Sequence, residues 1–200
     1  RAPLEHRAVV DGEVLVAEKV VGFKKIKQGT LENVGSGEVE LPQQEMQTTS
    51  AWLTLDPGLL AEISPRRDDL VDGLRALTHL IHSLAPIFLL CDIRDVGAWL
   101  GDGSPSQAGQ VVTRETMRAQ LLQGETFTPT IYLYDNQPGG IGLAERIFEV
   151  LPELLARGLE TLVACGCRSG CPSCVGPVNE VGRQAKPIAL GILKRLVARR

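Results

Sequence analysis

Four cysteines within ten residues constrain this chain more than any other feature of its sequence. They are Cys165, Cys167, Cys171 and Cys174, with the spacing C-x-C-x3-C-x2-C. Four thiolates this close together can surround one ion, and a tetrahedral Zn²⁺ with sulfur ligands is the commonest such arrangement. Because sulfur then fills all four positions, a zinc ion held here has no open position for substrate. We therefore expect one structural zinc ion that stabilises the fold.

Two other interpretations of the cysteines stay open on the sequence alone. Cys171 and Cys174 form a C-x-x-C pair of the kind found in thioredoxin-like redox proteins, although this leaves Cys165 and Cys167 without a role. A disulfide framework is disfavoured, because the sequence has no secretory signal and its 200 residues suffice to build a core without cross-links. Metal-bound thiolates agree with a reducing cytoplasm, where we expect the protein to be located.

The net charge of −3 conceals an uneven distribution along the chain. Residues 165–200 carry seven basic side chains and one acidic side chain, so their net charge is +6 and that of the preceding residues is −9. This basic part fits contact with nucleic acid or an acidic partner, with Arg168, Lys194 and Arg195 as candidate contacts. The alternative is a solvated helix end whose cations the macrodipole favours. Aromatic residues make up only 4% of the chain, which argues against an extended base-stacking surface.

Residues 8–55 alternate short β-branched runs with turn signals, which predicts an antiparallel sheet with one face in water. Asp11-Gly12 lies between two such runs and is typical of a hairpin turn. The same region contains three lysines close together: Lys24, Lys25 and Lys27. Such a cluster either protects a sheet edge from unwanted pairing or contacts phosphate groups.

Helical periodicity dominates the rest of the chain. Residues 68–85 carry apolar side chains at helical spacing, and Pro86 predicts the end of that helix or a bend. The apolar run 87–90 precedes acidic residues and indicates a buried strand. Residues 130–134 are β-branched and aromatic, which predicts a second strand. A helix that Gly158 closes, the cysteine cluster and a last helix then follow.

The fold class that these patterns predict is α+β. The order is an N-terminal antiparallel sheet, central helices, and then strand, helix, four-cysteine zinc knot and C-terminal helix. We expect a β-rich part at residues 1–60 and a mixed α/β part at residues 61–200 with the knot at 165–174, or one continuous domain. Because the sequence begins with Arg1 rather than Met, we expect it to be part of a longer protein.

A glycine-rich turn follows the strand at residues 130–134. Its Gly139 and Gly140 lie directly before a predicted helix, where backbone N–H groups can bind a phosphate. The turn has no lysine and therefore does not fit Walker A, and the dinucleotide fingerprint does not fit either. Tight packing of the strand against the helix is the alternative, and both interpretations stay open.

Several motifs together resemble one known family. They are YDNQPGGIGL at residues 134–143, the cysteine cluster at 165–174, VGFKK at 21–25 and CDIRDVG at 91–97. In this order they are similar to the MrfA Zn-binding (MZB) domain at the C-terminal end of MrfA-like superfamily 2 DNA helicases. The resemblance covers nearly the whole chain, and the glycine-rich motif joined to the four cysteines is its most specific part.

The resemblance implies an accessory domain rather than a motor. Members of the family carry their ATPase in two RecA-like domains that precede this region, unwind DNA with 3′–5′ polarity and act in repair of damage such as mitomycin adducts. The four cysteines match the family's metal ligands. The implied partners are single-stranded DNA and the motor domains of the same chain. Since this sequence contains no Walker A box, Walker B box or arginine finger, we expect no ATPase activity and no catalytic residue in it.

Two alternatives to a DNA-guiding helicase module stay open. One is a protein-interaction or scaffold module that binds zinc and does not contact DNA. The other is a metal-dependent nuclease, in which acidic side chains at strand ends would hold Mg²⁺. Its candidate residues are Asp92, Asp95, Asp135 and Glu145. Helix capping and turn formation explain the three aspartates equally well.

Overall fold

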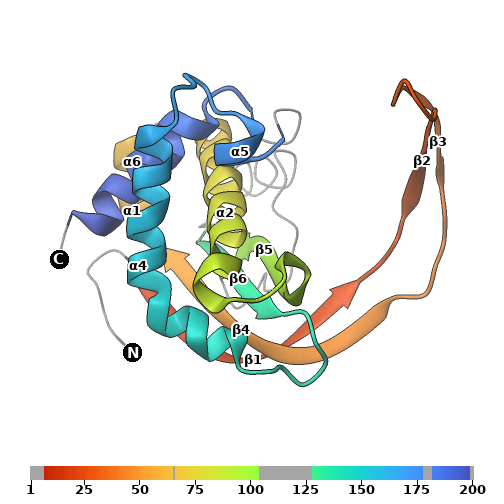
Figure 1. The fold of residues 1–200 in the computed structure, drawn as a ribbon, viewed down its shortest axis with the longest axis horizontal. Coiled ribbons are helices and arrows are strands. Elements are labelled where there is room, and N and C mark those ends of the chain that lie inside the picture. Colours follow the sequence, from red (N-terminus) through yellow and green to blue (C-terminus); the bar gives the residue numbers. More distant parts are fainter. Residues whose placement is uncertain (1–6, 65, 104–127, 178–181, 199–200) are drawn as a thin grey trace.

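The computed structural model describes residues 7–64, 66–103, 128–177 and 182–198 (Figure 1). The strands are β1 (Arg7–Glu18), β2 (Gly22–Ile26), β3 (Asn33–Glu38), β4 (Gln44–Leu55), β5 (Val96–Asp102) and β6 (Pro129–Asp135). The helices are α1 (Pro57–Ile63), α2 (Arg67–Leu89), the short 3₁₀ helix η1 (Ile93–Asp95), α4 (Leu143–Ala164), α5 (Pro172–Val175) and α6 (Ala185–Val197). The predicted α+β class and its element order are confirmed.

Four strands form an antiparallel sheet in the order β1-β4-β6-β5, and β2 and β3 pair separately. Beyond the sheet, the chain from β1 to β4 continues into the β2–β3 arm, a two-stranded ribbon that extends far from the helices (Figure 1). The hairpin predicted at Asp11-Gly12 is wrong. Both residues lie inside β1, opposite Ala51 and Ser50 of β4. The long partner strand keeps Asp11-Gly12 extended, and the chain reverses only at the tip of the arm.

The helix α2 extends beyond its predicted end. It continues through Pro86 to Leu89, so the strand expected at residues 87–90 is wrong. Phe88 and Leu89 pack against the hydrophobic core, and this packing outweighs the backbone hydrogen bond that the proline removes. Leu90 ends the helix in the left-handed conformation, with φ of 56°.

The helix α4 also runs further than its sequence suggests. It continues past Gly158, so the end predicted there is wrong. Gly158 is buried inside the helix, where a Cβ would lie 3.3 Å from Leu80 Cδ2 of α2. The glycine therefore permits a close approach of two helices, and α4 ends only at Ala164. Its last turn leads directly to Cys165, which fixes the position of the cysteine cluster relative to the core.

The core lies between one face of the sheet and the helices α2, α4 and α6 (Figure 1). Fully buried side chains come from every layer, and include Leu55, Leu74, Ile131, Leu154 and Ile192. The N-terminal strands β1 and β4 share their sheet with β5 and β6. The boundary between a β-rich part and a mixed part stays a prediction. Among the described helices, none combines the length and the apolar character that a membrane crossing requires.

Candidate metal centre

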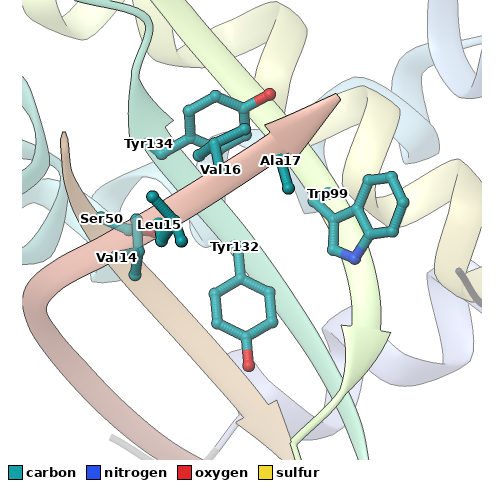
Figure 2. A pocket seen from close by; sticks show the side chains of 8 residues that line it. All are labelled: Val14, Leu15, Val16, Ala17, Ser50, Trp99, Tyr132 and Tyr134. Atoms are coloured by element: carbon teal, nitrogen blue, oxygen red, sulfur yellow. The ribbon is translucent and has the colours of Figure 1, made fainter. Parts of the chain in front are cut away.

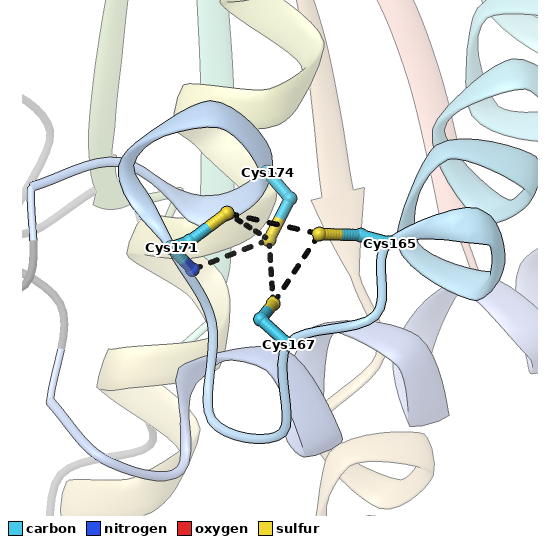
Figure 3. Close-up of side chains that lie close together, drawn as sticks. All are labelled: Cys165, Cys167, Cys171 and Cys174. Carbon is cyan, nitrogen blue, oxygen red and sulfur yellow. Dashed lines mark hydrogen bonds between the residues drawn. The ribbon is translucent and has the colours of Figure 1, made fainter.

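Four cysteine sulfurs converge beside the C-terminal end of α4 (Figure 3). Their Sγ atoms all lie within 4.8 Å of one another. Cys167 Sγ lies 3.4 Å from the Sγ atoms of both Cys165 and Cys174. Cys171 Sγ lies 3.6 Å from Cys174 Sγ and 3.7 Å from Cys165 Sγ. The fold therefore brings together the cluster that the spacing predicts.

The sulfur separations fit one tetrahedral ion. Four sulfurs at about 2.3 Å from a zinc ion lie about 3.8 Å apart, close to the 3.4 to 3.7 Å that separate four of the sulfur pairs in this cluster. A disulfide would need about 2.05 Å, and all five cysteines of the chain are free thiols. The donor set, four soft sulfurs, is also one that structural zinc sites use. A redox pair of Cys171 and Cys174 does not explain why two further thiols point at the same centre.

Local backbone structure aims each sulfur. Cys165 caps α4, and its N–H donates to the Thr161 carbonyl at 3.1 Å. Cys171 precedes α5, whose first turn carries Cys174, and the Cys171 N–H lies 3.4 Å from Cys174 Sγ. Gly170 makes the turn into this helix with φ of +121°, a conformation that favours glycine. A Cβ there would also lie 2.3 Å from Val175 Cγ2, so only glycine fits.

Lys186 of α6 is a part of this site that the sequence analysis missed. Its side chain is only 7% exposed. The Nζ donates hydrogen bonds of 2.6 Å to the carbonyls of both Cys165 and Cys167, and it lies 3.4 Å from Cys167 Sγ. The lysine thus ties the start of α6 to the first cysteine loop. No sequence signal distinguishes it from the surface lysines of the same basic segment.

The thiols of the cluster differ in their electrostatics. Burial raises the pKa of Cys174 to about 12. Burial also opposes ionisation of Cys167, but hydrogen bonds from Cys165, Cys174 and Lys186 outweigh it and lower the pKa of this thiol. Cys91, the fifth cysteine, lies outside the cluster at the end of α2, and burial together with Asp95 and Asp92 raises its pKa. The hydrogen bond from Lys186 therefore favours the thiolate form of Cys167.

Asp135 serves the N-terminus of α4 rather than a metal. Its side chain is fully buried, and Oδ2 accepts hydrogen bonds from the N–H groups of Ile141 and Leu143, both at 3.2 Å. The Thr49 hydroxyl donates to the same oxygen at 2.9 Å. Oδ1 has no hydrogen-bond partner in the described structure. A carboxylate at this place is stabilised by the positive end of the helix dipole.

The other acids of the nuclease hypothesis do not join Asp135. Asp92 and Asp95 cap η1 through reciprocal backbone hydrogen bonds. Glu145 is exposed in the first turn of α4. Within the described ranges, the four cysteines form the only group of three or more potential metal ligands. The arrangement of the acids is that of helix caps.

The glycine-rich turn already uses its backbone donors. Gly139 N–H donates to the Gln47 carbonyl at 2.8 Å, and Gly140 N–H donates to the Gln137 carbonyl at 3.0 Å. Gly140 has φ of +74°, and a Cβ there would lie 2.4 Å from Thr49 Oγ1. The turn therefore packs tightly on β4. A phosphate contact through these two amides would require both hydrogen bonds to break.

The basic candidates lie in separate places. Lys24, Lys25 and Lys27 are exposed on the β2–β3 arm and just after β2, and Lys25 Nζ lies 5.8 Å from the centre of the Phe23 ring. Lys194 and Arg195 are exposed near the end of α6, on the other side of the molecule (Figure 1). Arg168 is exposed between the second and third cysteines. The fold does not gather these cations into one patch.

All the tryptophans and tyrosines lie on the sheet face opposite the helices. The register places Trp52, Tyr132 and Trp99 in one row across β4, β6 and β5, with Tyr134 beside it. The Trp52 and Tyr132 ring centres are 6.0 Å apart. Three of these rings line a cavity of about 370 Å³ under the end of β1 (Figure 2). The low aromatic content of the sequence argued against such a surface. However, Tyr132 and Tyr134 are two residues apart in β6, so the alternation of side chains along a strand predicts that both lie on one face.

The described residues that line the cavity on this aromatic face carry no charge. The other side chains around the cavity are those of Val14, Leu15, Val16, Ala17 and Ser50. Burial raises the pKa of both tyrosines, and an acidic side chain adds to this: Asp102 for Tyr132 and Glu18 for Tyr134. The described residues that line the cavity therefore offer aromatic and aliphatic contacts, and none of them is a cation that could bind a phosphate group.

Comparison with known families and proteins agrees with the geometry. Residues 77–175 match the MrfA Zn-binding domain, a range that contains all four clustered cysteines. The chain is 34% identical over 185 residues to the uncharacterised ATP-dependent helicase YprA of Bacillus subtilis, and the match covers 92% of the chain and 22% of YprA. It is 31% identical over 130 residues to the uncharacterised protein MJ1572.1 of Methanocaldococcus jannaschii, covering 62% of the chain and 100% of that protein.

Solved structures give the same result. The crystal structure of the DUF1998 helicase MrfA bound to DNA is similar with a TM-score of 0.67 and 30% identity, covering 98% of this chain and 23% of that helicase. A second crystal structure of the DUF1998 helicase MrfA is similar with a TM-score of 0.52 and 26% identity. The chain thus spans about a fifth of the length of these helicases.

Proposed function

This chain belongs to the MrfA Zn-binding domain family, and from that premise we propose that it is the zinc-stabilised accessory module of an ATP-dependent 3′–5′ DNA helicase that acts in DNA repair. The observation that carries the proposal is the convergence of four sulfurs within 4.8 Å, inside the range that matches the family. In this proposal the module has no catalytic residue of its own and packs on the motor domains of the same polypeptide.

One Zn²⁺ ion is held by Cys165, Cys167, Cys171 and Cys174. When bound, the ion supplies a structural cross-link and no catalysis, because sulfur fills every position. The cross-link joins the end of α4 to α5, and Lys186 extends the connection to α6. Structural zinc contributes about 10–16 kcal/mol of apparent binding free energy in small domains. The C-terminal half of this core accordingly depends on the metal.

The module also contacts single-stranded DNA through exposed cations. The solved relative with the TM-score of 0.67 is described as bound to DNA, which supports a location near the strand. The contacts are Lys24, Lys25 and Lys27 on the arm, Arg168 in the cysteine cluster, and Lys194 and Arg195 in the last turn of α6. The turn at Gly139 and Gly140 contributes only if its internal hydrogen bonds open. Because the arm and the end of α6 lie on opposite sides of the molecule, their cations meet different stretches of one strand (Figure 1).

Salt-dependent binding of a labelled single-stranded oligonucleotide tests this DNA contact. Replacing Lys24, Lys25 and Lys27 together by alanine should weaken binding. It should also reduce the slope of log K against log salt by about 2, because each lysine that neutralises a phosphate of a single strand adds about 0.7 to that slope. Glu38→Gln on the same arm is the matched control, and it should not weaken binding. If the triple variant binds with the same affinity and slope as the wild type, the arm does not contact DNA.

A second candidate function is a protein-interaction module without DNA contact. The uncharged residues that line the cavity on the aromatic face favour it, and so do the large apolar side chains exposed on the arm, which include Phe23, Leu31 and Val34. The match also covers the whole length of MJ1572.1, so this relative has no further residues that could form motor domains. This function predicts no salt-dependent DNA binding by the wild type. It also predicts a complex with a protein partner that Trp99→Ala weakens and that Ile87→Ala, at an exposed site on α2, does not.

A further inference from the structure

Among the described residues, Lys186 is the one buried cation in contact with the cysteine cluster. Its ammonium group donates to two carbonyls of the first cysteine loop, at 2.6 Å each, and lies 3.4 Å from Cys167 Sγ. Its backbone N–H also donates to the Ser169 carbonyl at 3.3 Å. Within the part of the chain that the structure describes, Lys186 has no carboxylate partner. Its positive charge is therefore directed at the cluster alone.

A site of four thiolates needs such a charge. Zn²⁺ surrounded by four thiolates retains a net charge of about −2, and half-buried sulfurs cannot rely on water alone to compensate for it. Hydrogen bonds to ligand sulfurs and to the ligand backbone hold metal-binding side chains in orientation, and losing such a partner typically costs about 10- to 100-fold in metal affinity. The Lys186 Nζ can supply both the balancing charge and the orienting hydrogen bonds. It lies beside the Cys167 sulfur and donates to the carbonyls of Cys165 and Cys167.

We propose that Lys186 is a positioning residue of the metal centre, which balances the charge of the four thiolates and fixes the Cys165–Cys167 loop for zinc binding. This inference rests on the proposed zinc site. Through the lysine, zinc binding is also coupled to α6, because Lys186 lies in the first turn of that helix. Zinc loading therefore orders the start of α6 as well as α5.

Zinc affinity of the whole chain, measured by competition with a chromophoric chelator, tests the inference. Lys186→Met removes charge and donors, Lys186→Gln keeps donors without the charge, and Lys186→Arg keeps the charge. Lys19→Met, at an exposed site just after β1 with no role in the cluster or in the proposed DNA contacts, is the matched control. We expect about 10- to 100-fold weaker zinc binding for the Met and Gln variants, a smaller loss for Arg and none for the control. Absorption of the cobalt-loaded variants should still show four thiolate ligands.

The outcomes separate this inference from the proposed function. If Lys186→Met and Lys186→Gln bind zinc as tightly as the wild type, Lys186 has no role in the site. The proposed zinc site itself would then still stand. If Gln matches the wild type while Met does not, hydrogen bonding suffices and the charge-balance proposal is wrong. Should Lys186→Met fail to fold, the zinc affinities of Lys186→Gln and Lys186→Arg still show whether the positive charge is required. If the wild type itself binds no zinc, the proposed zinc site fails first.

Discussion

The Thr49 hydroxyl donates a hydrogen bond of 2.9 Å to the fully buried Asp135 carboxylate. The same oxygen accepts the N–H groups of Ile141, in the turn before α4, and Leu143, the first residue of α4, so this pair joins β4, β6 and α4. It lies at the end of the helix opposite the cysteine cluster. A polar junction and a thiol cluster thus hold the two ends of α4 in place.

This junction gives a first prediction. Asp135→Ala should lower the free energy of unfolding by about 3–5 kcal/mol, because it leaves buried N–H groups without an acceptor. Thr49→Val should cost about 1.5–3 kcal/mol, the range for a hydrogen bond to a charged group. Urea denaturation of the zinc-loaded chain measures both, and a double-mutant cycle should give coupling between them. Additive losses would show that the two side chains act independently.

The cysteines give a second prediction with an internal control. Cys167→Ser should weaken zinc binding severely and lower the midpoint of thermal unfolding, because it removes one of four ligands. Cys91→Ser should leave zinc content unchanged, since Cys91 lies outside the cluster. Zinc content after dialysis and the thermal midpoint are the measurements. Equal zinc content in the two variants would argue against the four-thiolate site.

Gly73 in α2 gives a third prediction, on packing. A Cβ there would lie 2.2 Å from Ile188 Cγ2 and 3.2 Å from the Ala189 backbone nitrogen of α6. In a helix, glycine to alanine usually stabilises by about 1 kcal/mol. Here we expect Gly73→Ala to destabilise by about 1–3 kcal/mol because α6 must shift. Gly35→Ala in β3, where a Cβ would lie 3.8 Å from Lys25 Cδ in ordinary contact, is the control and should be nearly neutral. A stabilised Gly73→Ala variant would mean that the helices are less tightly packed.

The two separated groups of cations give a fourth prediction. The alanine variant of Lys24, Lys25 and Lys27 and the alanine variant of Lys194 and Arg195 should each weaken single-strand binding. Because the sites lie far apart, their losses in binding free energy should add within about 0.5 kcal/mol. Fluorescence anisotropy of the two variants and of their combination measures this. No effect from the α6 pair would restrict the DNA contact to the arm.

Sequence reasoning predicted most of what depends on local pattern. The cysteine spacing predicted the cluster, and β-branched and aromatic residues predicted β6. It failed where tertiary packing overrides local signals: α2 passes through Pro86 and α4 through Gly158, because both helices bury apolar faces in the core. It missed Lys186, because a buried lysine is indistinguishable in sequence from an exposed one. The aromatic face was missed because its rings come from three strands that are far apart in sequence.

Zinc content together with thiol titration of the native chain tests the central claim most directly. The account predicts about one zinc per chain, and it predicts that the four clustered thiols are protected until a chelator removes the metal. Cys91 should be the cysteine that reacts while zinc is bound. A chain purified under reducing conditions that holds no zinc, with all five thiols equally reactive, would contradict the account.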